Sequence, residues 1–167
     1  MNESYAEAGV KRGKTTGSYV AKFGIIFAMV LILTVGVLFI GSFAVILFAL
    51  GIFVCYYMFP RFNVEYEYIY CDGQFDFDKI LGNAKRKTML RIDSDKIEMI
   101  APVKSHALDS YNHMELTVKD YTSLNEDANV YAMIAHGEKG NLKILFEPSE
   151  KMITCIKQKT PRKISEY

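Results

Sequence analysis

The sequence predicts a membrane α-helical hairpin followed by a mostly-β domain, in which seven strands form a curled sheet or barrel capped by a C-terminal helix. Three observations carry this prediction. No charged side chain lies between Lys22 and Arg61, a run of 38 residues. Short segments with apolar and polar residues in alternation follow this run, separated by turn residues. An amphipathic segment then lies at residues 149–159.

The uncharged run is too long for one membrane span and fits two short ones. A span needs about 20 helical residues to cross a hydrocarbon core about 30 Å thick. Gly41 and Ser42 lie near the middle of the run, where we expect the chain to turn. We therefore predict helices at residues 21–39 and 42–59, because Pro60 cannot continue the second helix.

Small residues within this run have two interpretations. They permit close contact between helices, or they reflect the general composition of membrane helices, and the second interpretation is the simpler one. These residues are Ala28, Gly36, Ala44, Ala49 and Gly51.

Basic residues flank the uncharged run on both sides. Lys11, Arg12, Lys14 and Lys22 precede it, and Arg61 follows it. The positive-inside rule therefore predicts a multi-pass protein with two membrane helices and both termini in the cytoplasm. A cleaved signal peptide is not expected, because the apolar run continues into a second span. The predicted divisions are a polar tail at residues 1–20, the transmembrane hairpin at 21–60, the cytoplasmic β domain at 61–163 and a short tail at 164–167.

Alternation of apolar and polar residues locates the strands of the β domain. Residues 63–70 place Tyr66, Tyr68 and Tyr70 on one face, where we expect core packing. The other strands are expected at residues 75–81, 85–93, 96–103, 115–121, 130–136 and 141–146. A short helical turn is expected at residues 107–111, inside the irregular stretch 104–114. The closing helix runs from the N-cap Ser149 to Lys159.

Composition excludes several function classes. Residues 61–167 contain 16 basic and 17 acidic residues, whereas binding of nucleic acid needs a clear excess of basic ones. The three cysteines are scattered, as expected in a reducing compartment without disulfides. The sequence contains no phosphate-binding loop, no dinucleotide fingerprint and no HExxH or GxSxG motif. We therefore predict a protein that is not an enzyme and has no cofactor and no metal.

One basic cluster is the candidate binding site. Lys85, Arg86 and Lys87 either contact anionic lipid headgroups or a partner, or form a solvated end of a hairpin. The irregular stretch 104–114 extends this candidate surface.

Two other groups of polar residues have chemical interpretations that we do not favour. Asp76 and Asp78 share a strand face and could hold a cation or act as an acid–base pair, although a solvated face explains them better. Ser105, His106 and Asp109 are the residue types of a nucleophilic triad but lie too close together in one loop.

The order of these features resembles the pleckstrin-homology-like (PH-like) fold. Gly82, the basic cluster, the alternating residues 89–92 and the pair Lys96-Ile97 resemble a motif of bacterial membrane-anchored PH domains. The layout is similar to that of small bacterial membrane proteins in which a two-helix hairpin precedes a PH-like domain. The resemblance implies a fold and a location in the bacterial cell membrane, and it brings no catalytic residues. Specific phosphoinositide binding is not expected, because the first hairpin, at residues 71–74, carries Asp72.

These observations predict a membrane-anchored, non-enzymatic PH-like binding or scaffold module at the inner face of the bacterial membrane. The expected partners are the lipid bilayer and either a protein partner or a second copy of the chain, and an exposed sheet edge offers a place for a partner strand. The alternative is an accessory subunit of a membrane transporter or a membrane-bound hydrolase.

Overall fold

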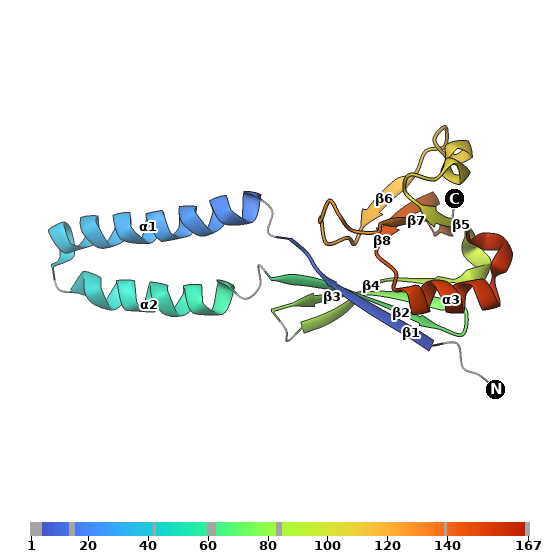
Figure 1. The fold of residues 1–167 in the computed structure, drawn as a ribbon. Helices are drawn as coiled ribbons and strands as arrows, with labels where there is room; N and C mark the ends of the chain where they lie inside the picture. Colours follow the sequence, from blue (N-terminus) through green and yellow to red (C-terminus); the bar gives the residue numbers. More distant parts are fainter. Residues whose placement is uncertain are drawn as a thin grey trace. The chain divides into compact units, whose positions relative to one another are not determined.

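The computed structural model describes residues 5–13, 16–41, 43–59, 63–82, 85–138 and 140–165. The chain divides into two compact units (Figure 1). The helical unit comprises Lys14–Val64 and Leu81–Ala84. The β unit comprises Met1–Gly13, Glu65–Ile80 and Lys85–Tyr167.

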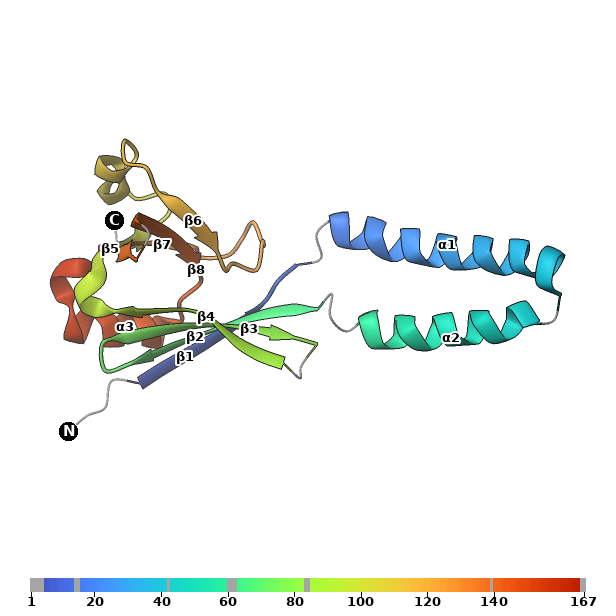
Figure 2. The ribbon, with the colours of Figure 1, turned by 180° about the vertical axis from the view of Figure 1, so that it is seen from behind.

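Two apolar helices make up most of the helical unit. Helix α1 spans Thr16–Ile40 and helix α2 spans Phe43–Met58. The two run antiparallel (Figures 1 and 2). Gly41 makes the turn with a φ of 67°, a left-handed conformation that suits glycine. The turn lies where the sequence predicts it, and α1 begins five residues before the expected residue 21.

Small residues bring α1 and α2 into close contact. A Cβ atom at Gly36 would lie 3.0 Å from the Cβ of Ala44, and one at Gly51 would lie 3.0 Å from the Cε of Met29. The side chain of Ala44 is only 3% exposed. For these three residues the interpretation as background composition is therefore wrong, whereas Ala28 and Ala49 are exposed.

One helix in the described part of the chain is long and apolar enough to cross a membrane. Its apolar stretch, Tyr19–Phe39, has 21 residues, and none of it is buried within the protein. The apolar stretch of α2, Phe43–Tyr57, is shorter. The length and composition of the helices therefore support a single membrane candidate, and the second span stays a prediction.

The first sheet contains four strands in the order β1-β2-β3-β4. They span Tyr5–Lys11, Val64–Cys71, Gln74–Leu81 and Lys85–Asp93. Strand β1 lies inside the segment predicted as a polar tail. It escapes sequence analysis because its inward positions include small alanines, of which Ala6 is fully buried, so its alternation is faint.

Because β1 precedes the strand that was predicted to be the first, the predicted hairpin at residues 71–74 does not join the first two strands. Strand β1 pairs with β2 along its whole length in an antiparallel register, from Tyr5↔Cys71 to Lys11↔Glu65. The turn at Asp72 and Gly73 therefore joins the second and third strands, and our identification of it as the first hairpin is wrong. The connection between the first two strands contains both apolar helices.

The second sheet has the order β5-β7-β8-β6. Its strands span Ile97–Pro102, Thr117–Asp120, Tyr131–Gly137 and Gly140–Phe146 for β5 to β8. All seven predicted strands exist, but β6 pairs with β8 in parallel, so the sheet is mixed. The described residues therefore form eight strands in two four-stranded sheets, where seven strands in a curled sheet or barrel were predicted, and these residues form no closed barrel.

Aromatic side chains fill the core of the β unit. Tyr68 packs edge-to-face against Phe77 and Phe146, with ring centroids 5.8 and 5.7 Å apart. Tyr66, Tyr68 and Tyr70 are all buried, which confirms the predicted core stripe.

The closing helix α3 spans Glu150–Lys159 and completes this core, as predicted. The hydroxyl of Ser149 accepts a hydrogen bond from the N–H of Met152 at 3.3 Å, which caps the helix. Met152 and Ile156 are fully buried, and α3 contacts β1.

Truncation of Met152 should destabilise the β unit. Met152→Ala removes a fully buried side chain and leaves a cavity, so we expect a loss of about 2–5 kcal/mol in the free energy of unfolding. The protein has 11 tyrosines and no tryptophan, so near-ultraviolet circular dichroism of the buried tyrosines reports the transition. The exposed neighbour provides the control, because Lys151→Ala should change stability by no more than about 0.5 kcal/mol. Equal effects of the two variants would contradict the placement of α3 in the core.

Candidate functional site

The predicted basic cluster lies at the start of β4, an edge strand of the first sheet. Lys85, Arg86 and Lys87 are all exposed. The Arg86 guanidinium contacts the Glu67 carboxylate, and its Nε lies 3.7 Å from Asp78 Oδ2. Lys85 and Lys87 form no ion pair with the described residues. Two of the three cations are therefore free to meet an outside ligand.

Carboxyl groups from three neighbouring strands explain why Arg86 is occupied. Glu67 has a raised pKa, because burial and a hydrogen bond with Glu7 favour its protonated form against the attraction of Arg86. The pKa of Glu7 is lowered, first by a hydrogen bond from the Tyr5 hydroxyl at 2.6 Å. Asp78 is only 5% exposed, and its Oδ1 has no hydrogen-bond partner among the described residues. Arg86 is thus the counter-ion of a partly buried acidic row.

The two aspartates of β3 do not act as a pair. The Arg91 guanidinium holds Asp76 through two hydrogen bonds, of 2.6 Å from Nε and 2.7 Å from Nη2. Asp78 instead lies beside Arg86. A search of the described residues finds no group of three or more His, Cys, Asp or Glu side chains arranged to hold a metal ion.

The loop with triad residue types is held by local hydrogen bonds. Ser105 Oγ accepts a hydrogen bond from the N–H of Ala107 and caps a short 3-10 helix at His106–Tyr111. His106 Nδ1 lies 3.1 Å from Asp109 Oδ2, but its side chain is 99% exposed. These local contacts stabilise the loop.

A groove of about 580 Å³ lies beside β4 in the β unit. One wall contains Met89 to Ile92 of β4, and the other contains Thr117 and Lys119 of β6. Its remaining lining includes Lys96, Gly137, Glu138 and Leu142. The groove therefore combines apolar side chains with charged ones, and sequence analysis did not find it because it joins strands distant in the chain.

Strands β4 and β6, which both line this groove, end their sheets. Within the described part of the chain, no strand pairs with the outer edge of β4 or of β6. The other two outer strands have neighbours. The C-terminal segment covers β5 through a bridge from Ile164 to Ile100 and a 2.8 Å hydrogen bond from the Ser165 N–H to the Ile100 carbonyl, and α3 contacts β1.

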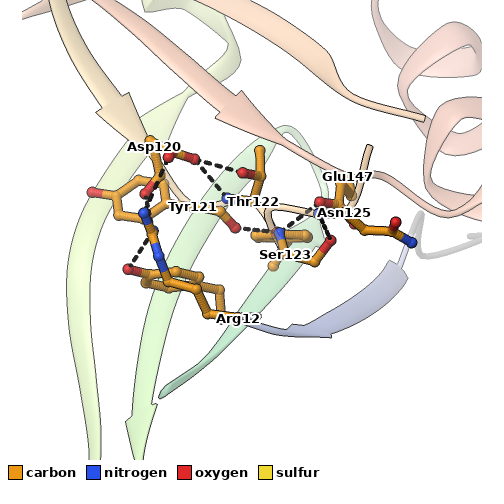
Figure 3. Close-up of polar contacts among 9 residues, drawn as sticks. Arg12, Asp120, Tyr121, Thr122, Ser123, Asn125 and Glu147 are labelled. Carbon is orange, nitrogen blue, oxygen red and sulfur yellow. Dashed lines mark hydrogen bonds and ion pairs between the residues drawn. The ribbon is translucent and has the colours of Figure 1, made fainter. Parts of the chain in front are cut away.

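A second polar centre links the two sheets through Arg12, directly after β1 (Figure 3). Its Nη1 donates to the Tyr66 hydroxyl and to the Asp120 carbonyl, both at 3.0 Å. Its Nη2 donates to Asp120 Oδ2 at 3.1 Å. The other Asp120 oxygen accepts from the N–H and hydroxyl of Thr122. The end of β1 is thereby fastened to the residues after β6.

Backbone and carboxylate contacts extend this fastening. The Gly13 N–H donates to the Ser123 carbonyl at 2.6 Å. The Ser123 N–H donates to Glu147 Oε1 at the same distance (Figure 3). The arrangement joins the end of β1 to the segment that follows β6. It is a structural lock at the place where the chain leaves the first sheet for α1.

Loss of Arg12 should weaken this lock. Arg12→Ala leaves the half-buried Asp120 carboxylate without its charged partner, so we expect stability to fall by about 1–3 kcal/mol. Lys11→Ala is the matched control, because the Lys11–Glu65 pair is exposed on the lysine side and contributes no more than about 1 kcal/mol. Thermal unfolding followed by circular dichroism distinguishes the two variants. An Arg12→Ala variant as stable as Lys11→Ala would show that the contacts of Arg12 do not stabilise the β unit.

The comparisons with known proteins agree with this architecture. The family described as "Bacterial PH-like domain (DUF6106)" matches residues 2–166. No curated protein and no solved structure was found to match the chain. The match includes β1, both helices, the two sheets and α3, so it treats the helices as part of the family's sequence. The chain belongs to the bacterial PH-like domain family.

Proposed function

We propose that this PH-like domain is a membrane-anchored, non-enzymatic binding or scaffold module at the inner face of the bacterial membrane. PH-like domains are generally binding modules without catalytic activity, and this chain belongs to that class. The observation that carries the membrane part is the pairing of β1 with β2 on either side of the apolar helices.

The covalent chain limits how the helices cross a bilayer. Residues 12–15 connect β1 to α1, and residues 59–63 connect α2 to β2. Four or five extended residues reach at most about 14–18 Å, which is less than the hydrocarbon core of about 30 Å. Paired strands therefore keep the start of α1 and the end of α2 on one side of the membrane. A single crossing is incompatible with this pairing, and two crossings satisfy it.

The surface of the two helices favours lipid as their solvent. Large apolar side chains such as Phe23, Phe27, Leu38, Phe43 and Phe53 are more than half exposed. At about 1.5 Å per residue, α1 is about 38 Å long and α2 about 24 Å. The short α2 requires local thinning of the bilayer, and the long α1 requires tilt.

The inner face follows from the basic residues at the ends of the hairpin. Lys11, Arg12, Lys14 and Lys22 precede the apolar run and Arg61 follows it. Basic residues close to short apolar helices favour the cytoplasmic side. Both termini are accordingly cytoplasmic in this proposal.

Lys85 and Lys87 are the basic residues that we propose for contact with anionic headgroups. Arg86 contributes less, because Glu67 and Asp78 already neutralise it. Each basic residue near a membrane surface contributes about 1 kcal/mol. Two free lysines therefore give a preference for anionic lipid without strong selection of one headgroup.

Cysteine labelling tests the two crossings. In a variant whose three native cysteines are replaced, Ser42→Cys places a thiol between α1 and α2, and Glu126→Cys places one in an exposed loop of the β unit. A membrane-impermeant maleimide should label Ser42→Cys in intact cells and Glu126→Cys only after permeabilisation.

Each other labelling pattern contradicts part of the proposal. Labelling of Glu126→Cys in intact cells would place the β unit outside the cell. If Ser42→Cys reacts only after permeabilisation, the hairpin does not cross the bilayer. A chain recovered entirely in the soluble fraction would refute the membrane anchor.

Charge reversal tests the lipid contact. The full chain carrying Lys85→Glu and Lys87→Glu, reconstituted in nanodiscs of phosphatidylglycerol and phosphatidylcholine, should retain severalfold less phosphatidylglycerol than the unmodified chain. Native mass spectrometry of the bound lipids measures this preference. Lys151→Glu with Arg162→Glu makes the same change of charge at two other exposed positions and should leave the preference close to that of the unmodified chain. If the chain carrying Lys85→Glu and Lys87→Glu has the same lipid preference as the unmodified chain, these lysines do not contact the headgroups.

A further inference from the structure

We propose that the groove between β4 and β6 binds an extended, acidic peptide segment of a partner protein, which adds as a strand to the free edge of β4. The proposal rests on the binding role proposed above and names the class of partner. It does not depend on Lys85 and Lys87 contacting lipid.

The arrangement of strand edges carries the first step. Of the four strands that end the two sheets, β1 has α3 beside it and β5 has the bridge to Ile164. The outer edges of β4 and β6 have no strand partner among the described residues, and both strands line the same groove. Free backbone N–H and C=O groups on a strand edge are the groups that an added strand pairs with.

The side chains of the groove suit alternating residues. Leu90, Ile92 and Leu142 supply an apolar surface, and Met89 is 43% exposed at the rim. An added strand points every second side chain to the same face, so apolar residues at alternate positions can pack against this surface.

The charges of the groove select an acidic occupant. The Arg91 guanidinium pairs with Asp76. His136 Nε2 lies 2.6 Å from Glu98 Oε1. Lys96 and Lys119 line the groove and form no ion pair with the described residues. Glu138 is the acidic group of the lining, so two free ammonium groups face one carboxylate.

The same charges disfavour a second copy of this chain. Strand β4 contains four basic residues and one acidic residue. Antiparallel pairing of two β4 strands about Met89 would place Lys87 of each copy beside Arg91 of the other. Like charges on directly opposite residues are destabilising. The same basic residues that repel a second copy of β4 attract an acidic strand.

Peptide binding to the full chain in detergent micelles tests the proposal. The probe is a fluorescent ten-residue peptide in which valine alternates with glutamate. Fluorescence anisotropy should report saturable binding, and hydrogen exchange should show slower exchange of the β4 amides at residues 89–92 when the peptide is bound.

Two control peptides separate strand addition from simple charge attraction. A peptide with lysine in place of glutamate should bind at least about tenfold more weakly, because Lys96 and Lys119 repel it. A glutamate peptide with two central prolines keeps its charge but cannot pair along β4, and it should leave the β4 amides unprotected.

Charge-matched variants locate the site. Lys96→Glu with Lys119→Glu should weaken binding of the acidic peptide at least about tenfold. Lys151→Glu with Arg162→Glu changes the net charge equally at exposed positions outside the groove and should leave affinity within about twofold. The circular dichroism of both variants establishes that they fold.

Three outcomes overturn the proposal. Absence of binding by the acidic peptide is one, and equal loss of affinity in the two charge variants is another. Protection of the β4 amides in the peptide-free chain, together with a dimer in analytical ultracentrifugation, would assign the edge to a second copy. None of these outcomes depends on the cysteine labelling test, so failure of the peptide site and failure of the membrane anchor are distinguishable.

Discussion

The antiparallel pairing of β1 with β2 is the constraint on which the rest of the molecule depends. Two strands that exchange hydrogen bonds from Tyr5↔Cys71 to Lys11↔Glu65 must have the intervening chain leave and return at one end of the sheet. The 52 residues from Arg12 to Asn63 therefore have to fold back on themselves. The antiparallel helices, the turn at Gly41 and the close contacts at Gly36 and Gly51 meet this requirement. For the proposed membrane anchor, the same pairing requires an even number of crossings.

The pairing is reinforced where it is most exposed to disturbance by the helices. The lock around Arg12 joins the end of β1 to Asp120 in the second sheet, and Gly13 continues it through Ser123. A guanidinium with two hydrogen bonds to one residue holds orientation as well as position. The lock lies beside the core contact of Tyr66 with Tyr121, whose ring centroids are 5.3 Å apart.

The sequence predicted the elements whose signal is local and missed those whose signal is not. Alternation of large residues located β2 through β8, and Ser149 located the start of α3. Strand β1 has alanine at inward positions where β2 has tyrosine, so its pattern was faint. The alternation of apolar and polar residues within a strand does not show which strand it pairs with, so the parallel pairing of β6 with β8 was missed. Arg12 and Asp120 are 108 residues apart, and no spacing rule connects them. Only part of the candidate site could be predicted. The sequence identified Lys85 to Lys87, but it did not show that the carboxylates of Glu67 and Asp78 lie beside Arg86.

Among the described residues some strand edges are covered and others are open, and the proposed groove lies beside two of the open edges. An open strand edge is a hazard in a soluble environment, and proteins commonly cover it or place charge on it. This chain covers β5 with its C-terminal segment, places α3 against β1, and puts lysine and arginine on β4. Charge differs from a physical cover, because it repels strands of like charge and leaves the backbone groups available to strands of opposite charge. The basic edge of β4 is therefore both protection against self-association and a filter for acidic partners. For a module confined to a membrane surface, where partners meet at high effective concentration, such a filter provides selectivity without requiring a tight site.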